Sequence, residues 1–342
     1  MRGLSQAEIQ KCNFTLKMNT EHRELENQQE SNINLFNRSK VIIDEIKEML
    51  GGNGGDDTAK KRLIDVYGEF TAETMAHLIF GSNMQERAGM GYDETYKLCL
   101  EVFNGNDIDP ADIDPRSEEY QREIGRLRSE KIENDPKMEH VIRSRREVIQ
   151  HAQALIHITT MALDRDEPLT EELIKETHKI MCEGLDGNNA VQFQPNWAGE
   201  YRNCVAGDGT TTFCDPSMVP AEMRKFVKAF NEDVRRSEKS GDIDPFFLAA
   251  DICQDFVMIH PSRDGNGRMC RLVANAYLIK YAGVMISIGE HDEDRKDYLN
   301  IVMVAAEIDR EEEGRGMLAS FFLSKAAGTL ARLKQKLHKD KN

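Results

Sequence analysis

The chain has 342 residues, of which 39% are hydrophobic, enough for one large core or two ordinary ones. Its 24 Gly and 9 Pro are together under a tenth of the chain, and this scarcity of helix breakers favours an all-α fold. The 45 basic and 60 acidic side chains give a net charge of −15, which argues against nucleic acid and anionic membranes as partners.

Cysteine usage and hydropathy indicate the compartment. The seven Cys are an odd number in a long chain, and no apolar run approaches the roughly 18 residues of a transmembrane helix. The first residues, MRGLSQAEIQ, contain no apolar signal core. We therefore expect reduced thiols and a cytoplasmic protein, with the nucleus as the alternative.

The N-terminal third shows helical patterns separated by glycine. Apolar side chains recur at helical spacing over 35–50, and the glycine-rich stretch 51–57 predicts a hinge, so 1–57 is expected to be a helical arm. A second apolar stripe covers 58–80. Gly81 and Ser82 are predicted to end that helix and cap the next one, because Ser82 and Gln85 have the spacing of a capping box.

The rest of the chain alternates loops with helical patterns. Two Asp-Pro steps within 104–119 predict a surface loop, and helical spacing resumes near Lys137. A turn-rich segment, 186–216, is predicted to contain a β-hairpin. Further helices are predicted for residues 169–184 (with Thr170 as N-cap), 220–237, 244–259, 269–282, 294–307 and from 317 into a basic tail that we expect to be a solvated helix end.

One short segment has the residues for chemistry. The helix that begins at Asp244 must end near Pro261, which leaves His260 at the helix end. Gly265 and Gly267 follow, and they permit a turn whose backbone N–H groups point inward just before the next helix begins. A helix, a glycine turn and a second helix predict a cradle for an anion.

The charged residues of this segment suit a phosphate ligand. Arg268 and Arg271 are three residues apart on one helix face and can clamp phosphates, while Asp264 offers an oxygen ligand for Mg²⁺. His260 is a candidate general base near neutral pH. An ordinary turn is the alternative for such a motif, whereas a calcium-binding EF-hand is excluded because Val273 stands where its Glu is required. Phosphoryl or nucleotidyl transfer is the reaction class that follows.

The segment HPSRDGNGRMCR, residues 260–271, resembles the signature of the Fic family, H-P-F-x-[DE]-G-N-G-R-x-x-R. Ser262 replaces the family's Phe, which usually packs beneath the loop, so we expect a looser loop. The resemblance implies a Fic-type helical bundle with a small β-hairpin flap and an N-terminal helical extension. It divides the chain into an N-terminal helical region over 58–168, a catalytic domain over 169–319, and a C-terminal helix and tail over 320–342.

The resemblance also implies an activity. Fic proteins mostly transfer AMP from ATP to a Ser, Thr or Tyr hydroxyl of a target protein and release pyrophosphate, with Mg²⁺ as cofactor. His260 would be the base and Asp264 the Mg²⁺ ligand. The residues expected to hold the phosphates are Gly265, Asn266, Gly267, Arg268 and Arg271.

Two weaker matches extend the expected nucleotide site. GEYR at 199–202 and the turn-rich residues after it resemble the family's flap, which places Gly207, Asp208 and Gly209 near the nucleotide. Tyr298 resembles the aromatic residue that stacks on adenine, and a core tyrosine is the alternative.

The segment SNMQER at 82–87 resembles the inhibitory helix of many Fic proteins, [ST]-x-x-x-E-[GN], with Arg87 where Gly or Asn is usual. The resemblance implies an inhibitory helix near 82–90, in which Ser82 belongs to the motif and Glu86 pairs with Arg271 and denies it to ATP. The alternative is a helix start, with Ser82 as cap and Glu86 as a first-turn acid. Fic relatives often form homodimers, for which an exposed stripe of Ile42, Ile43 and Ile46 is a candidate.

Two other functions remain open at this point. The same site would serve removal of AMP from a modified target, or transfer of another phosphate-bearing group. A nucleotide-sensing scaffold with weak catalysis is the third alternative, suggested by Ser262.

Overall fold

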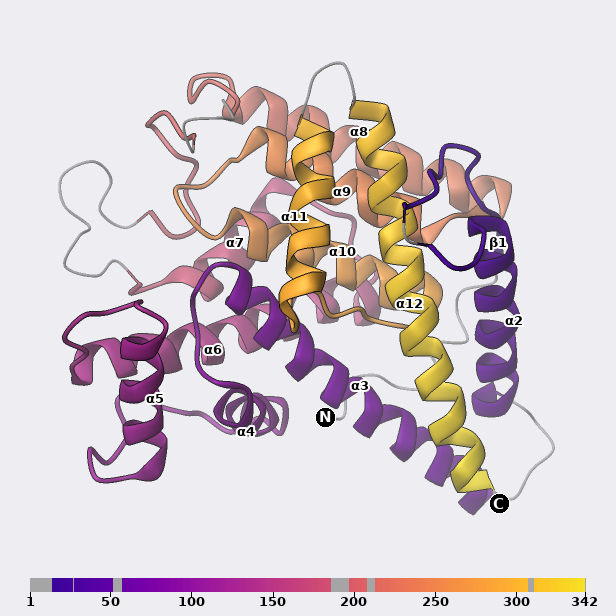
Figure 1. Cartoon of the computed structure of the whole chain (residues 1–342). Coiled ribbons are helices and arrows are strands. Elements are labelled where there is room, and N and C mark those ends of the chain that lie inside the picture. Colours follow the sequence, from indigo (N-terminus) through magenta and orange to yellow (C-terminus); the bar gives the residue numbers. More distant parts are fainter. Residues whose placement is uncertain are drawn as a thin grey trace.

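The computed structural model describes residues 14–26, 28–51, 57–185, 197–207, 213–306 and 311–341. Helices dominate this part of the chain, which confirms the all-α class (Figure 1). The elements are β1 (Thr15–Leu16), α2 (Asn32–Gly51), α3 (Asp57–Gln85), α4 (Tyr92–Phe103), α5 (Glu118–Ser129), α6 (Met138–Thr159), the π-helical turn η1 (Thr160–Asp164), α7 (Glu171–Cys182), α8 (Val219–Ser240), β2 (Asp242–Ile243), α9 (Pro245–Ile259), α10 (Asn266–Ala282), α11 (Asp292–Ala306) and α12 (Glu311–Lys341).

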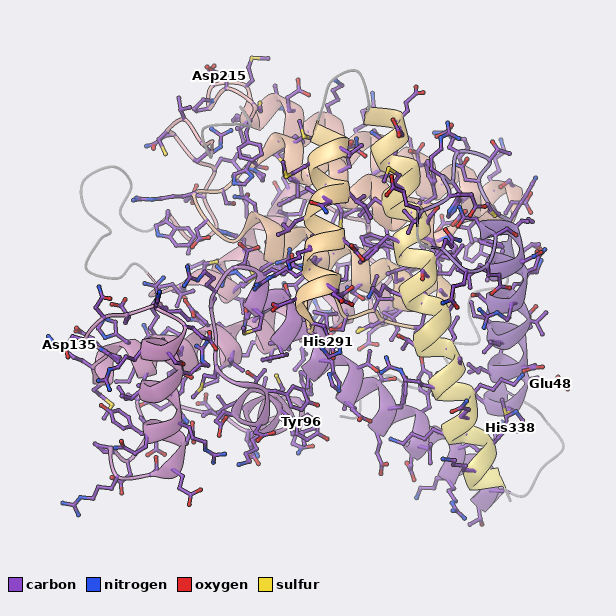
Figure 2. The ribbon with its side chains drawn as sticks, viewed as in Figure 1. Glu48, Tyr96, Asp135, Asp215, His291 and His338 are labelled. Atoms are coloured by element: carbon purple, nitrogen blue, oxygen red, sulfur yellow. The ribbon has the colours of Figure 1, made fainter. Side chains whose placement is uncertain are left out.

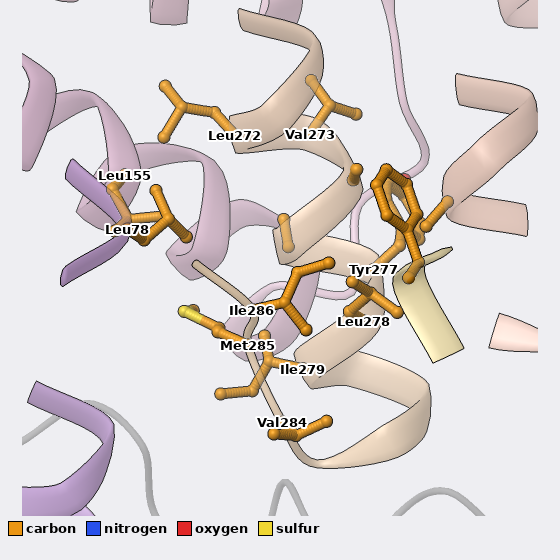
Figure 3. Close-up of a cluster of buried hydrophobic side chains, with 14 of the residues drawn as sticks. Leu78, Leu155, Leu272, Val273, Tyr277, Leu278, Ile279, Val284, Met285 and Ile286 are labelled. Carbon is orange, nitrogen blue, oxygen red and sulfur yellow. The ribbon is translucent and has the colours of Figure 1, made fainter. Parts of the chain in front are cut away.

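Helix α10 is the centre of the core. All of its residues except Gly267 and Lys280 are buried, because its sequence is apolar around most of its circumference. Side chains of α10 pack against Leu78 of α3, Leu155 of α6 and the segment 284–286 that follows α10 (Figure 3). Helix α9 packs along α10, and α11 and α12 lie in front of this pair in Figure 1.

Local signals in the sequence explain how the helices of the catalytic half begin. The Asp244 carboxylate accepts hydrogen bonds from the N–H groups of Phe246 and Phe247 at the start of α9. Thr170 caps α7 in the same way by accepting from the N–H of Leu173 at 3.0 Å. Both caps agree with the sequence-based prediction.

Helix α3 does not end where the sequence predicts. It continues through Gly81 and Ser82 to Gln85, so Ser82 is not an N-cap and the capping box is absent. The glycine serves packing instead, because a Cβ atom at Gly81 would lie 2.6 Å from the backbone oxygen of Ile288. Ser82 is 1% exposed and faces α10.

The predicted dimer stripe and the predicted solvated tail are both packed against the molecule's own core. Ile42, Ile43 and Ile46 of α2 are buried, which removes them as a docking stripe. The tail forms the end of α12, whose Leu333 and Leu337 are fully buried against neighbouring helices. Only its outer face, with His338, points to solvent, as does Glu48 on the adjacent α2 (Figure 2).

The predicted β-hairpin is not seen in the described part of its segment. Residues 197–207 and 213–216 contain no strand there, only a single bridge at Gly207, and the rest of 186–216 lies outside the described residues. The strands that the structure describes are β1 and β2, which pair in parallel and tie residues 15–16 to the start of α9.

Within the described ranges, the helices are too short or too polar to cross a membrane.

Candidate active site

The loop between α9 and α10 holds His260 in a constrained position. His260 ends α9 with φ 50° and ψ 60°, a left-handed conformation that costs energy for a side chain with a Cβ. Arg202, a buried residue of the GEYR segment, donates from Nε to the carbonyl of His260 at 2.6 Å. Its backbone N–H donates to the carbonyl of Pro261 at 2.8 Å. These bonds fix the end of the helix and the direction of the imidazole.

The imidazole of His260 is suited to accept a proton. Its ring stacks on Phe213, with centroids 3.9 Å apart and planes 14° apart. Burial lowers the pKa of His260 and the Arg202 guanidinium lowers it further, while the Val257 backbone and the carboxylates of Glu86 and Asp264 act in the opposite direction. The net lowering keeps His260 neutral at pH 7, the state that a general base requires.

The side chain of Asn266 makes its hydrogen bonds within the loop. Its side chain is 2% exposed; Oδ1 accepts from the N–H of Ser262 and Nδ2 donates to the carbonyl of Ser262, both at 2.8 Å. The side chain therefore closes the loop rather than facing a ligand. Because both bonds go to the backbone at Ser262, they are retained whichever side chain stands at that position.

The carboxylate of Glu86, the residue that follows α3, lies against the first turn of α10. Gly265 adopts φ 78° and precedes α10, as a turn of this kind requires. A Cβ atom at Gly267 would lie only 2.4 Å from Oε1 of Glu86 and 3.1 Å from Nη1 of Arg271. Glu86 thus reaches the place where the helix N-terminus favours an anion.

Arg271 is fully engaged by the end of α3. Its Nε donates to the Ser82 hydroxyl at 2.8 Å, and Nη2 donates to the Ser82 carbonyl at 3.0 Å and to Oε1 of Glu86 at 2.9 Å. Gln85 accepts a longer bond, 3.4 Å, from Nη1. The side chain of Arg271 is 4% exposed, while that of Glu86 is 36% exposed.

Arg268 is as deeply buried as Arg271 and has far fewer contacts. Its nearest carboxylate is Asp264, with Nη2 at 3.6 Å from Oδ1. Within the described part of the chain, Nε and Nη1 of Arg268 have no hydrogen-bond partner. Buried guanidinium N–H groups without a partner are costly, so their presence beside a helix N-terminus indicates a site built for an external anion.

Comparison with known proteins agrees with this geometry. Residues 168–278, which include the His260 loop and most of α10, match the model of the Fic/DOC family.

Over residues 168–278 the chain is therefore similar to Fic proteins.

Curated relatives match over limited lengths. A Fido domain-containing protein of Dictyostelium discoideum is 37% identical over 83 residues, which are 24% of this chain and 55% of that protein. A protein named protein adenylyltransferase Fic, from Nematostella vectensis, is 30% identical over 157 residues, which are 45% of this chain and 33% of that protein. The matches cover less than two thirds of each relative.

Solved structures of Fic proteins share the fold. The crystal structure of a Fic domain containing signaling protein from Bacteroides thetaiotaomicron aligns with TM-score 0.59 and 22% identity, over 90% of this chain and 98% of that one. Fic-1 from C. elegans aligns with TM-score 0.59 and 17% identity, over 90% of this chain and 73% of that one.

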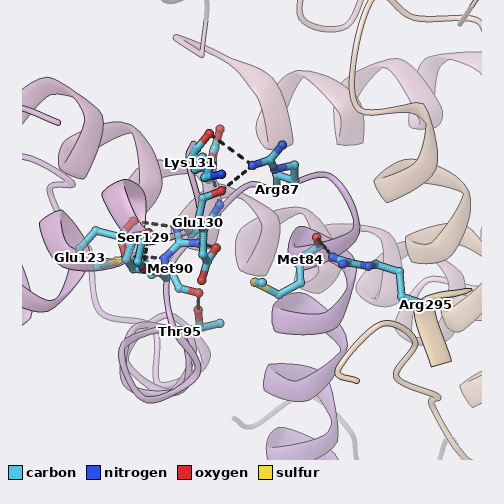
Figure 4. A network of polar contacts seen from close by, with 12 residues as sticks. Met84, Arg87, Met90, Thr95, Glu123, Ser129, Glu130, Lys131 and Arg295 are labelled. Carbon is cyan, nitrogen blue, oxygen red and sulfur yellow. Dashed lines mark hydrogen bonds and ion pairs between the residues drawn. The ribbon is translucent and has the colours of Figure 1, made fainter. Parts of the chain in front are cut away.

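A second turn, outside residues 168–278, positions Glu86. Glu86 follows α3 directly, and Arg87 then adopts φ 55°, where the inhibitory motif has Gly or Asn. The Arg87 guanidinium donates to the carbonyl of Glu130, at the end of α5, at 2.6 Å, and Arg126 of α5 donates to the carbonyl of Gly89 (Figure 4). Helix α5 therefore holds the turn that carries Glu86.

The structure decides one of the nucleotide contacts expected outside the signature and leaves the others as predictions. Tyr298 is 2% exposed and packs on Phe321, so it is a core tyrosine and does not offer a ring face to adenine. Gly207 is described and exposed, whereas Asp208 and Gly209 lie outside the described residues.

Asp264 is the candidate metal ligand of the site. Its side chain is 55% exposed at the mouth of the cradle, and Oδ1 accepts from the N–H of Gly265 at 2.6 Å. No group of three or more His, Cys, Asp or Glu side chains that would hold a metal occurs among the residues described. A lone carboxylate fits Mg²⁺ bound mainly through phosphates and water.

Sequence reasoning missed three side chains that shape the site. Arg202 belongs to the quoted GEYR motif, but its hydrogen bonds to carbonyls at the end of α9 were not foreseen. Phe213 and His178 gave no local signal, because their contacts with His260 and Asp264 join segments far apart in the chain. Their places follow only from the tertiary structure.

Proposed function

We propose that this protein transfers AMP from ATP to a hydroxyl group of a target protein. The observation that supports the proposal most strongly is a neutral His260 beside a helix N-terminus, where Arg268 has unpartnered N–H groups. The match to the Fic/DOC family and the relative named an adenylyltransferase support the same reaction.

Each step of the proposed transfer can be assigned to a residue of the site or to ATP. His260 accepts the proton of the target hydroxyl, and the hydroxyl oxygen forms a bond to the α-phosphorus of ATP. The bond from that phosphorus to the bridging oxygen breaks, and pyrophosphate leaves. Arg268 and the N–H groups at the start of α10 stabilise the charge on the phosphates. Mg²⁺, which would be held by Asp264, supplies charge neutralisation when it is bound.

Intact mass after incubation with ATP and Mg²⁺ tests this proposal. We expect the chain to gain one AMP by modifying itself or an added target, and His260→Ala to lower the rate by about 100-fold or more. His291→Ala is the matched control, because His291 is exposed and distant from the loop in sequence (Figure 2). Full labelling in His260→Ala would show that His260 is not the base.

We further propose that Glu86 inhibits the transfer. The carboxylate shares Arg271 with any phosphate that would bind over the first turn of α10, so the two anions compete for one guanidinium. The Ser82 hydroxyl and carbonyl keep Arg271 oriented towards Glu86. The inhibitory pairing therefore uses the last turn of α3 and the residue after it.

Removal of AMP from a modified target is a second candidate. It is favoured by Glu86, whose partly exposed carboxylate stands over the cradle where it can orient water. Incubation with a target that already carries AMP separates the two reactions: release of AMP that depends on Glu86 supports removal, and retention of AMP supports transfer alone.

A further inference from the structure

A buried histidine outside the signature joins the two halves of the site. His178 lies on α7 and is 2% exposed. The backbone N–H of Gly199, in the turn before the flap, donates to its Nδ1 at 2.8 Å. Its Nε2 lies 2.9 Å from the backbone carbonyl oxygen of Asp264.

The geometry fixes the tautomer of this ring. A backbone N–H can only donate, so Nδ1 of His178 must be the acceptor. The proton therefore resides on Nε2, which donates to the carbonyl of Asp264. One neutral side chain thus makes one bond to each of two loops.

The turns at Gly199 and Gly265 both lie close against α7. Gly199 has φ 79°, and a Cβ atom there would lie 3.0 Å from the carbonyl oxygen of Lys175. A Cβ atom at Gly265 would lie 2.9 Å from Met181 and 3.3 Å from Nε2 of His178. The two glycine turns are therefore seated on α7, and the imidazole is the hydrogen-bonding group between them.

We propose that His178 is a positioning residue that sets the direction of Asp264. The bond to the Asp264 carbonyl fixes the peptide that precedes Gly265, and with it the carboxylate at the mouth of the cradle. The bond from Gly199 aligns the flap side with the same peptide. This inference rests on the proposed function, because it concerns the metal ligand of that reaction.

Two substitutions separate the two hydrogen bonds. His178→Gln places an amide N–H near the position of Nε2 and keeps the bond to Asp264, while it lacks an acceptor at Nδ1. His178→Asn places an oxygen near Nδ1 and keeps the bond from Gly199, while it is too short to reach Asp264. Thr177→Val is the matched control, because Thr177 is buried in the same helix and its hydroxyl donates to the Leu173 carbonyl.

The readout is the Mg²⁺ concentration needed for half-maximal ATP binding, measured by calorimetry in a Glu86→Gly background. We expect His178→Asn to raise this concentration about tenfold, as outer partners of metal ligands do. His178→Gln and Thr177→Val should stay within about twofold, even where their melting temperatures fall.

The outcomes distinguish positioning from simple packing. An unchanged Mg²⁺ dependence in His178→Asn, or equal shifts in all three variants, would overturn the proposal. The readout is ATP binding, so it does not depend on whether AMP is transferred. A chain that binds ATP with Mg²⁺ and never labels a protein would refute the proposed function while leaving this inference open to the same test.

Discussion

Arg268 and Arg271 lie one turn apart on α10 and are equally buried, yet their surroundings differ sharply. Arg271 is surrounded by acceptors from the end of α3, including the carboxylate of Glu86. Arg268 keeps two nitrogen positions without partners within the described chain. Arg271 thus has a hydrogen-bonded carboxylate at 2.9 Å, whereas the nearest carboxylate to Arg268 is that of Asp264 at 3.6 Å.

This difference divides the cradle into an occupied and a free half. The free half lies by Asp264, and the occupied half is covered by Glu86 over Gly267. A nucleotide phosphate must therefore displace a hydrogen-bonded carboxylate to reach Arg271, whereas no such carboxylate is bonded to Arg268. The proposed inhibition by Glu86 would therefore leave the Arg268 half of the site intact.

Removing the internal anion should have the largest effect. We expect Glu86→Gly to raise AMP transfer by about 100-fold, because couplings of about 1–3 kcal/mol are usual between linked sites. Glu86→Gln keeps the size of the side chain without its charge and should give an intermediate rate. Transfer is followed with ATP labelled at the α-phosphate, and an unchanged rate in Glu86→Gly would make Glu86 a structural acid only.

Weakening each arginine in turn should separate the contributions of Arg268 and Arg271 to ATP binding. Arg268→Lys keeps the charge but loses the planar fork, and we expect ATP binding to weaken about tenfold whether or not Glu86 is present. Arg271→Lys should weaken ATP binding only in the Glu86→Gly background. Calorimetric titration of these four variants and of their two parents, wild type and Glu86→Gly, checks this. Equal losses for both arginines in the wild-type background would contradict the division of the cradle.

Loosening the turn that holds Glu86 should have the smallest effect. Arg87→Asn suits φ 55° and cannot reach the Glu130 carbonyl, so we expect a rise in AMP transfer of about threefold, the scale of one net hydrogen bond. Arg128→Asn, at an exposed position of α5, is the matched control. Equal rates in wild type and Arg87→Asn would show that α5 does not help to hold Glu86.

The helices around the signature could be predicted because their signals are local. Asp244, Pro261 and Gly265 act through their own backbone or the next turn, so the end of α9 and the start of α10 follow from the sequence. The signature then places His260 and both arginines together. The all-α class follows from the same helical periodicity.

The errors occur where tertiary contacts outweigh local preference. The sequence predicts a helix end at Gly81, but the backbone at Ile288 lies so close that only glycine fits within the helix. Helix α5 escaped prediction because only Glu123 and Leu127 of its residues are buried, which leaves no apolar stripe. Tyr298 resembles a stacking residue, while the packing of α11 on α12 places it in the core.

Calorimetric affinities for ATP and for AMP, in wild type and in Glu86→Gly, show whether Glu86 competes with a phosphate for Arg271. AMP lacks the outer phosphates and has no need of Arg271, so we expect its affinity to be unchanged by the substitution. The affinity for ATP should rise about tenfold, because Glu86 no longer competes for Arg271. Equal changes for both nucleotides, or no change for ATP, would contradict the competition between Glu86 and a phosphate for Arg271.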